Sequence, residues 1–538
     1  MLPPLHHIGR HQYFYLCVLL FFLLTGCAQH RKSIFIDPND ASTQYSTCFH
    51  AVHNDLCKGL HRDICKKLDA IDAKMQAKHQ YDDGFAEDMG MLNLLEISSL
   101  YLSTGNVDKS LEYSRYSECL IEKRENEPEI WELLRKGGNF FGSMAGGGGE
   151  FSVYDPVGYE RVLLLNIQAM DYLLKGDERA FNVALKSTDW QDLEREKFEK
   201  HLETLKKQSA DLEKEGNKEG EHIDRKQSKK NRKIKNTVFR RLTKEFSKYN
   251  RKALKVPSAF VNPFGDYLAG VAKEYKSVDS DFRSQMDNAR IHYENARKLN
   301  PKSKVLKLAY KDAKKRRSAK RLVQIVAFDG FAPEKNILRF DIKIKQCPIP
   351  IHIELPVYDP VKSKVHHIVV TTTGGRRLAR FWPVANIENL ALRHQKDMLP
   401  VVQAMVAIAA IRDAALQIGS RAVSQAVQKK YGPLAGAVAH TILVKGLNGL
   451  DKLLEPDTSS WMSLPKRILA ARFHPPNHLK TIVITSYDAK GRRQAREKIK
   501  LGRGGRHFIF VRTTDKAMKV ISGKKIWSPK GKIKRIDC

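Results

Sequence analysis

The spacing of apolar residues changes near residue 321, and this change constrains the fold more than any other feature of the chain. From 45 to 321 the apolar residues recur at three- and four-residue intervals, as between Leu92 and Leu102, which is the spacing of one face of an α-helix. From 322 onwards they alternate with polar residues, most clearly between Ile337 and Lys345, which is the spacing of one face of a β-strand. The sequence therefore predicts an α+β chain in which helices come first and strands follow.

The helical part contains segments that resemble tetratricopeptide repeats (TPRs), in which helix pairs pack through small residues and tyrosines. A helical hairpin is expected from Leu94 to Glu122, because Gly105 can end one helix and Asn106 can open the next. The residues that match packing positions of the repeat are Tyr101, Gly105, Tyr172, Gly176, Ala289, Tyr293, Ala296 and Pro301. The matches are incomplete and irregularly spaced, so we expect TPR-like hairpins with insertions in residues 45–321.

One such insertion, residues 191–256, is highly charged. Nine of the seventeen residues from Arg225 to Arg241 are basic, and Ile234, Val238 and Phe239 interrupt them. A basic amphipathic helix that contacts an anionic membrane surface is one interpretation. A solvated helix with frayed ends is the other, and it is the more common outcome for such a segment.

The second part, residues 322–514, carries several strand-like segments separated by glycine turns, which favours an antiparallel β-sandwich. These segments are residues 322–328, 337–345, 350–357, 366–373, 468–473, 481–487 and 507–513. Residues 386–454 interrupt them and are expected to form a buried helical hairpin, because the apolar stretch Leu399–Ile411 is too short to span a bilayer. Residues 515–538 are expected to be a basic C-terminal tail.

The start of the chain is typical of an exported lipoprotein. The apolar run from Tyr13 to Leu24 has 12 residues, whereas a membrane-spanning helix needs roughly 20. It ends in Leu24-Thr-Gly-Cys27, which resembles the lipobox of bacterial lipoproteins. The resemblance implies that residues 1–26 are a cleaved signal peptide, that Cys27 carries lipid and that 27–44 form a tether. An ordinary signal peptide followed by a chance cysteine is the alternative.

Charge and the residue after Cys27 bear on location and partners. Ala28 replaces the aspartate that favours the inner membrane in such lipoproteins, so we expect the outer membrane, with the protein facing the periplasm. The formal net charge of +34 would suggest nucleic acid, but an exported protein does not meet it there. Anionic lipid headgroups or acidic envelope polymers are the available counterparts, and a diffuse charge that only maintains solubility is the simpler explanation.

The cysteines offer disulfide bonds, which an oxidising periplasm permits. The candidates are Cys48, Cys57, Cys65 and Cys119. If residues 50–67 are one helix, Cys57 and Cys65 lie about 12 Å apart along its axis, too far for a bond between them. Cys48 or Cys119 is then expected to pair with one of them, and the sequence leaves the choice open.

The sequence predicts no catalytic site, no metal and no cofactor. His53, Cys57, His61 and Cys65 recur every fourth residue, but as a set they extend too far along a helix to share one metal ion. Three further histidines lie on or beside expected strands, without a nucleophile or paired carboxylate motif to act with: His366, His367 and His474.

Short motifs spread over residues 90–514 carry a family resemblance. They are Leu94-Leu-Glu-Ile, Tyr101-Leu-Ser-Thr-Gly105, Tyr159-Glu-Arg-Val162, Phe264-Gly-Asp-Tyr-Leu-Ala-Gly270, Asp329-Gly-Phe-Ala-Pro333, Leu355-Pro-Val-Tyr358, Ser460-Trp-Met-Ser-Leu-Pro465 and Phe510-Val-Arg-Thr513. In these the chain resembles a family of uncharacterised bacterial lipoproteins that join TPR-like helices to a C-terminal β domain. No catalytic residues are established for that family, so the resemblance implies location, architecture and a role in envelope assembly.

These observations together predict a non-enzymatic adaptor or scaffold of the cell envelope, held to the membrane by its N-terminal lipid. Its helical surface would bind an envelope protein whose identity the sequence does not give. The alternatives are an enzyme that modifies an envelope polymer and a structural lipoprotein without a specific ligand. The enzyme requires a pocket in which at least two titratable residues converge, and the adaptor requires a groove.

Overall fold

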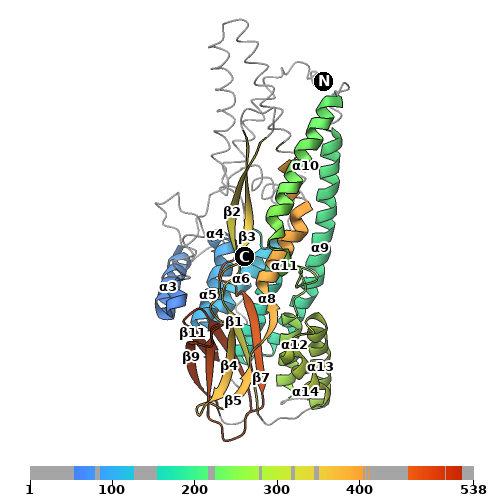
Figure 1. Ribbon diagram of the computed structural model, residues 1–538. Helices are drawn as coiled ribbons and strands as arrows, with labels where there is room; N and C mark the ends of the chain where they lie inside the picture. Colours follow the sequence, from blue (N-terminus) through green and yellow to red (C-terminus); the bar gives the residue numbers. More distant parts are fainter. Residues whose placement is uncertain are drawn as a thin grey trace, which may run out of the picture.

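The structure is a computed structural model, shown in Figure 1. It describes residues 52, 54–78, 85–125, 154–215, 225–277, 281–316, 321–343, 350–400, 402–403, 406–407, 410, 458–502 and 505–523. Helices come first and sheets follow, so the α+β class predicted from the change of period is confirmed.

The helical part is a succession of helices, most of which pack against the next one along the chain. They are α3 (His61–Lys78), α4 (Phe85–Met89), α5 (Met91–Thr104), α6 (Val107–Glu125), α8 (Gly158–Lys175), α9 (Arg179–Glu215), α10 (Arg225–Ser247), α11 (Asn250–Ala253), α12 (Phe264–Lys276), α13 (Phe282–Leu299) and α14 (Lys304–Lys314). Helix α5 packs on α6, α6 on α8, α8 on α9, α9 on α12, α12 on α13 and α13 on α14. None of the helices in the described ranges combines the length and hydropathy needed to cross a membrane.

The turns expected between paired helices are present. Gly105 and Gly176 both adopt the left-handed conformation, with φ of 104° and 69°, and their N–H groups satisfy carbonyls of the helices that they end. Ala289, Tyr293 and Ala296 are fully buried on α13. Gly270 on α12 is needed there, because a Cβ atom at this position would lie 2.6 Å from the Tyr293 ring.

The strands form three sheets. They are β1 (Arg321–Asp329), β2 (Glu334–Ile342), β3 (Ile351–Asp359), β4 (His367–Thr372), β5 (Arg377–Arg380), β6 (Trp382–Asn386), β7 (Arg467–Phe473), β8 (Thr481–Tyr487), β9 (Arg493–Lys500), β10 (Gly505–Thr513) and β11 (Met518–Ser522). A five-stranded sheet has the order β11-β10-β1-β7-β6, a four-stranded sheet has the order β5-β4-β8-β9, and β2 and β3 form a separate ribbon.

Two expectations for this part were wrong. The five-stranded sheet is mixed rather than antiparallel, because β1 pairs with β10 in parallel and with β7 antiparallel. The segment expected to be only a basic tail, 515–538, contributes β11 to this sheet. Of the helical insertion, residues 387–400 are helical, and most of the segment beyond them lies outside the described ranges.

The five-stranded sheet is covered on both faces, which is why all nine residues of β1 are buried. On one face Val326, Phe328 and Phe510 share an apolar cluster with the helices, including α12 and α13. On the other face Ile325 and Ile509 share a second cluster with the four-stranded sheet. The helical part and the sheets are therefore joined through one continuous core at the domain boundary predicted at residue 321.

Helix α10, in the second half of the charged insertion, has its apolar side buried within the protein. Its apolar stripe, Ile234, Val238, Leu242 and Phe246, is buried in a third cluster. That cluster is completed by residues of the β2–β3 ribbon and of the 387–410 segment. Figure 1 shows the helix and the ribbon standing side by side. The stripe is thus covered inside the protein, and the exposed residues of α10 include Arg232, Lys233, Arg240, Arg241 and Lys244.

Candidate functional site

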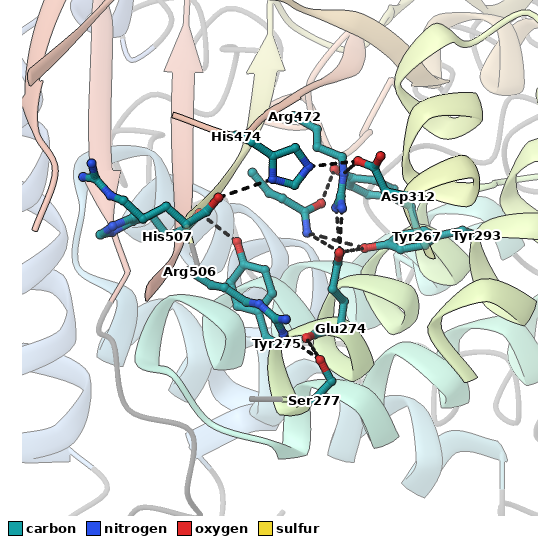
Figure 2. A network of polar contacts seen from close by, with 12 residues as sticks. Tyr267, Glu274, Tyr275, Ser277, Tyr293, Asp312, Arg472, His474, Arg506 and His507 are labelled. Carbon is teal, nitrogen blue, oxygen red and sulfur yellow. Dashed lines mark hydrogen bonds and ion pairs between the residues drawn. The ribbon is translucent and has the colours of Figure 1, made fainter. Parts of the chain in front are cut away.

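A network of buried charged side chains lies where the helices meet the five-stranded sheet (Figure 2). Its centre is Arg472 of β7, which has no exposed side-chain surface. Its guanidinium donates two hydrogen bonds to Glu274 of α12, at 2.5 and 2.6 Å, and one to Asp312 of α14, at 3.0 Å. The charge-assisted hydrogen bonds of this buried arginine thus connect three elements, β7, α12 and α14.

Neutral side chains complete the hydrogen bonds of this network. Tyr293 donates to Glu274 over 2.7 Å, and the Gln324 amide of β1 donates to the same carboxylate over 3.0 Å. Tyr267 in turn donates to the Gln324 carbonyl oxygen over 2.9 Å. Each carboxylate oxygen of Glu274 therefore has a donor, as buried polar groups require.

The network also fixes the charges of its members. Burial raises the pKa of Glu274, but the charge and hydrogen bonds of Arg472 outweigh it, so the pKa lies below the ordinary value for glutamate. Burial likewise raises the pKa of Asp312, but the hydrogen bonds with His474 and Arg472 and the charge of Arg472 outweigh this effect. The pKa of Asp312 therefore lies below the ordinary value for aspartate. The two carboxylates are thus ionised partners of Arg472 at neutral pH, and neither has the raised pKa of a general acid.

Two smaller contacts join strands of the sheet to one another and a loop to the helices. Asp329 of β1 accepts from Arg467 over 2.6 Å and from Thr513 over 2.7 Å, which ties three neighbouring strands together. Glu96 of α5 accepts from the backbone N–H groups of Met462 and Ser463, at 2.6 and 3.1 Å. The motifs that carried the family resemblance therefore include residues that hold the helices, strands and loop together.

A groove opens between the edges of the two sheets. It has a volume of about 980 Å³ and lies between β9, the last strand of the four-stranded sheet, and β11, the last strand of the five-stranded sheet. The basic residues along it are Arg493, Arg496, Lys498, Lys500, Lys516 and Lys519, and the acidic residue is Glu497. Like charges held this close favour an anionic occupant.

The turn before α3 forms one wall of this groove. Gly59 lines it with φ of 79°, and the turn brings His61 against the strands. Burial, together with the charges of Lys519 and Arg512, lowers the pKa of His61 to about 4. The imidazole is therefore neutral at pH 7 and adds no charge to the basic groove.

A second, smaller hollow lies on the other side of β11. Its volume is about 480 Å³, and Ser522 lines both hollows. The α5–α6 turn at Gly105, the end of α8 at Lys175, and the Cys65 side chain of α3 close it. Strand β11 thus runs between two open spaces of different chemistry.

The cysteines differ from the expected disulfide pairing. Cys57 and Cys65 are both free thiols, whereas Cys119 is disulfide-bonded. A turn at Gly59 interrupts the helix, so the condition of the spacing argument, one helix over residues 50–67, is not met. Burial raises the pKa of both free thiols. The negative charge of Asp69 also raises the pKa of Cys65.

The other residues singled out from the sequence either make packing contacts and hydrogen bonds within the fold or lie outside the described part. Cys27, with the signal peptide and tether, and Cys48 are outside it. Tyr101 donates to Asp69 of α3 over 3.0 Å, and Arg179 stacks over the Tyr172 ring at 5.0 Å. Among the described residues no group of three or more histidine, cysteine or acidic side chains has the arrangement of a metal site.

Neither the buried network around Arg472 nor the groove between β9 and β11 was identified from the sequence. The network had one signal in the sequence, because Arg472 is the single charged residue in the apolar segment Ile468–Phe473. The groove had none, since β9 and β11 were not predicted as strands. Comparison of the chain with protein-family models, with curated proteins and with solved structures finds no match.

Proposed function

We propose that this protein is a lipid-anchored adaptor of the bacterial cell envelope, cleaved before Cys27 and bound to an envelope protein through the groove between β9 and β11. The observation that carries the proposal is a contrast between two regions. The buried charges around Arg472 are paired with one another, whereas the basic residues of the groove border an open space. We take an open groove lined mainly by basic residues to be a binding site and not a catalytic one.

The architecture that we propose is correspondingly that of a TPR-like helical stack and a β-sandwich. The stack rests on the succession of packed helices and on the buried positions of Tyr101, Tyr172 and Tyr293. The sandwich rests on the apolar cluster shared by the five- and four-stranded sheets. In this arrangement the helices cover one face of the sandwich and leave its open edge, the groove, accessible.

An envelope-polymer-modifying enzyme remains the alternative from the sequence. We favour the adaptor because the groups of opposite charge that converge around Arg472, namely Glu274 and Asp312, are buried against it. A reaction needs such groups beside a space that a substrate can enter. The groove offers that space but carries mostly one sign of charge.

The proposal is tested by cross-linking in intact cells of the source bacterium with an epitope-tagged full-length chain. We expect one or two envelope proteins to be enriched, and Cys27→Ala to lose both membrane attachment and that enrichment. The double variant Lys498→Glu/Lys500→Glu should lose the partners while staying on the membrane.

The matched control reverses two exposed lysines of α10, Lys233→Glu/Lys244→Glu, which changes the net charge equally and leaves the groove intact. Equal loss of partners in both double variants would show that only overall charge matters, and would support a structural lipoprotein without a specific ligand. Recovery of no protein above background from the unaltered chain would reject the adaptor.

A further inference from the structure

The free edge of β11 has an unusual position, because it separates the two hollows. Among the described strands β11 pairs only with β10, in antiparallel register from Thr513↔Met518 to Ile509↔Ser522. Met518, Val520 and Ser522 line the basic groove, while Ile521 and Ser522 line the smaller hollow. An unpaired strand edge offers backbone donors and acceptors to another chain.

The register shows which backbone groups are offered. Gly523 N–H donates to the Phe508 carbonyl over 2.8 Å, and Thr514 N–H donates to the Ala517 carbonyl over 3.0 Å. In an antiparallel pair every second residue bonds to the partner strand, so Lys519 and Ile521 bond to β10. The N–H and C=O groups of Met518, Val520 and Ser522 therefore point to the free edge.

Side chains alternate in the same way. Met518 and Val520 contact the apolar cluster between the two sheets, whereas Lys519 and Ile521 lie within 3.2 and 3.7 Å of a Cβ position built on Gly105, on the helical side. A strand added to β11 would direct its own side chains alternately to these two sides. Every second side chain of the added strand would enter the basic groove beside β9, and the side chains between them would enter the smaller hollow.

We propose that β11 binds an extended acidic segment of the partner protein by strand addition, with acidic side chains in the basic groove and small apolar ones in the hollow at Gly105. This rests on the adaptor function proposed above and names its mode of binding. Backbone hydrogen bonds supply affinity in this mode, and the alternate side chains supply specificity. Basic residues beside an edge strand repel basic strands and attract acidic ones, which favours an acidic segment.

The chain's own C-terminal segment is a poor occupant for the same reason. Residues 524–538 contain four lysines and one arginine beyond Lys524 and a single aspartate, so their charge has the same sign as the groove. Polyphosphate or an anionic lipid surface matches the charge but offers no backbone to pair with Val520. The two kinds of occupant are separated by a probe whose backbone alone is altered.

The experiment measures fluorescence anisotropy of a labelled heptapeptide of alternating valine and glutamate, added to the full mature chain with Cys27→Ser. Two isomers of the peptide carry N-methyl groups on alternate residues, one on the odd and one on the even positions. We expect one isomer to bind like the parent peptide and the other to bind about tenfold more weakly or worse, because only one set of N–H groups faces β11. Equal binding of both isomers would overturn strand addition.

Variants of β11 test the same point from the protein side. Val520→Pro removes an N–H group that faces outward and leaves the bonds to β10 in place, which is where an edge strand tolerates proline. It should weaken peptide binding about tenfold, whereas Val520→Ile should not, since it keeps the N–H group. If Val520→Pro does not fold, Ser522→Pro and its control Ser522→Ala provide the same comparison at an exposed position.

The outcomes also distinguish this inference from the adaptor proposal. If polyphosphate or phosphatidylglycerol vesicles displace the peptide and bind equally to Val520→Pro, the groove binds anions by charge alone and the inference is wrong. If Val520→Pro captures the same partners in cells as the unaltered chain, the adaptor stands and strand addition fails. If the peptide binds as expected but no protein is captured in cells, strand addition stands and the adaptor role fails.

Discussion

At the scale of single residues, the junction of helices and sheet depends on a cation that has no contact with water. Arg472 carries no exposed side-chain surface, and its charge is balanced by Glu274 and Asp312. Forming such a buried pair contributes little net stability, because both partners lose their hydration. Removing one partner is costly, however, since it leaves the others charged and unpaired in a medium of low polarity.

Arg472→Met should therefore destabilise the protein by about 3–5 kcal/mol, measured by urea unfolding followed by circular dichroism. Adding Glu274→Gln should restore part of this loss, because the glutamine is neutral and can still accept from Tyr293. The control is Arg376→Met, at an exposed turn, which should change stability by less than about 0.5 kcal/mol. A loss below about 1 kcal/mol for Arg472→Met would contradict a structural role for the network.

His394 is a second residue whose protonation is linked to folding. Its ring lies near those of Tyr159 and Phe198, at 6.3 and 5.2 Å between centroids, and its Nδ1 atom is buried without a described hydrogen-bond partner. Burial, aided by the charge of Lys335, lowers its pKa to about 4. Because the pKa is lower in the folded state, the unfolded chain takes up a proton first as the pH falls.

The stability contributed by neutral His394 should thus be complete above pH 6.5 and decline between pH 6.5 and 4, by up to about 3 kcal/mol. His394→Gln should remove this decline, which is measured as the difference in unfolding free energy between variant and unaltered chain at each pH. Taking the difference cancels Glu160, whose pKa burial raises to about 7 and whose effect has the opposite sign. A difference that does not change with pH would contradict the linkage.

At the scale of elements, sequence patterns predicted the central strands and failed at the edges. Strands such as β1 and β8 carry apolar side chains for buried positions, so their composition or alternation was visible. Strand β9, with the sequence RQAREKIK, has charged side chains at most positions, and β11 was read as part of a basic tail. Edge strands are often protected by charges, which erases the pattern that would predict them. The candidate groove lies between these two strands.

In helix α10 the amphipathic pattern was visible in the sequence, but the element that covers its apolar face was not. The spacing of Ile234, Val238, Leu242 and Phe246 predicts an amphipathic helix, yet nothing in it specifies what covers the apolar face. The β2–β3 ribbon that covers it lies about a hundred residues further along the chain. A helix whose apolar face contacts a membrane and one whose apolar face packs on a distant ribbon have the same spacing of apolar residues.

Leu242→Ala should loosen α10 and the ribbon together, because the lost contacts and cavity cost about 2–5 kcal/mol at a buried leucine. Hydrogen exchange should accelerate in Arg225–Ser247, Glu334–Ile342 and Ile351–Asp359, with little change in β1 or β10. Lys244→Ala, on the exposed face, is the control and should leave exchange unchanged. Acceleration confined to α10 would show that the ribbon does not depend on it.

At the scale of the whole molecule, the predicted boundary at residue 321 is a change of secondary structure and not a gap between cores. The five-stranded sheet gives one face to the helices and the other to the four-stranded sheet. Hydrogen bonds cross the boundary as well, since Tyr275 of α12 donates to the His507 carbonyl over 2.8 Å. Hydrophobic periodicity reports the local element and carries no information on which distant faces share a core.

Helices and central strands should consequently unfold together. We expect one urea transition whose midpoint is the same by far-ultraviolet circular dichroism and by hydrogen exchange in β1 and β10, and Arg472→Met should shift both equally. A fragment limited to residues 45–321 should not fold cooperatively, because it exposes the apolar face that includes Phe264 and Tyr267. Two separate transitions, or a well-folded fragment, would mean that the helices form an independent domain. In that case the sheets alone would supply β9 and β11, whereas the wall of the groove at Gly59 and the smaller hollow at Gly105 would depend on the helical part.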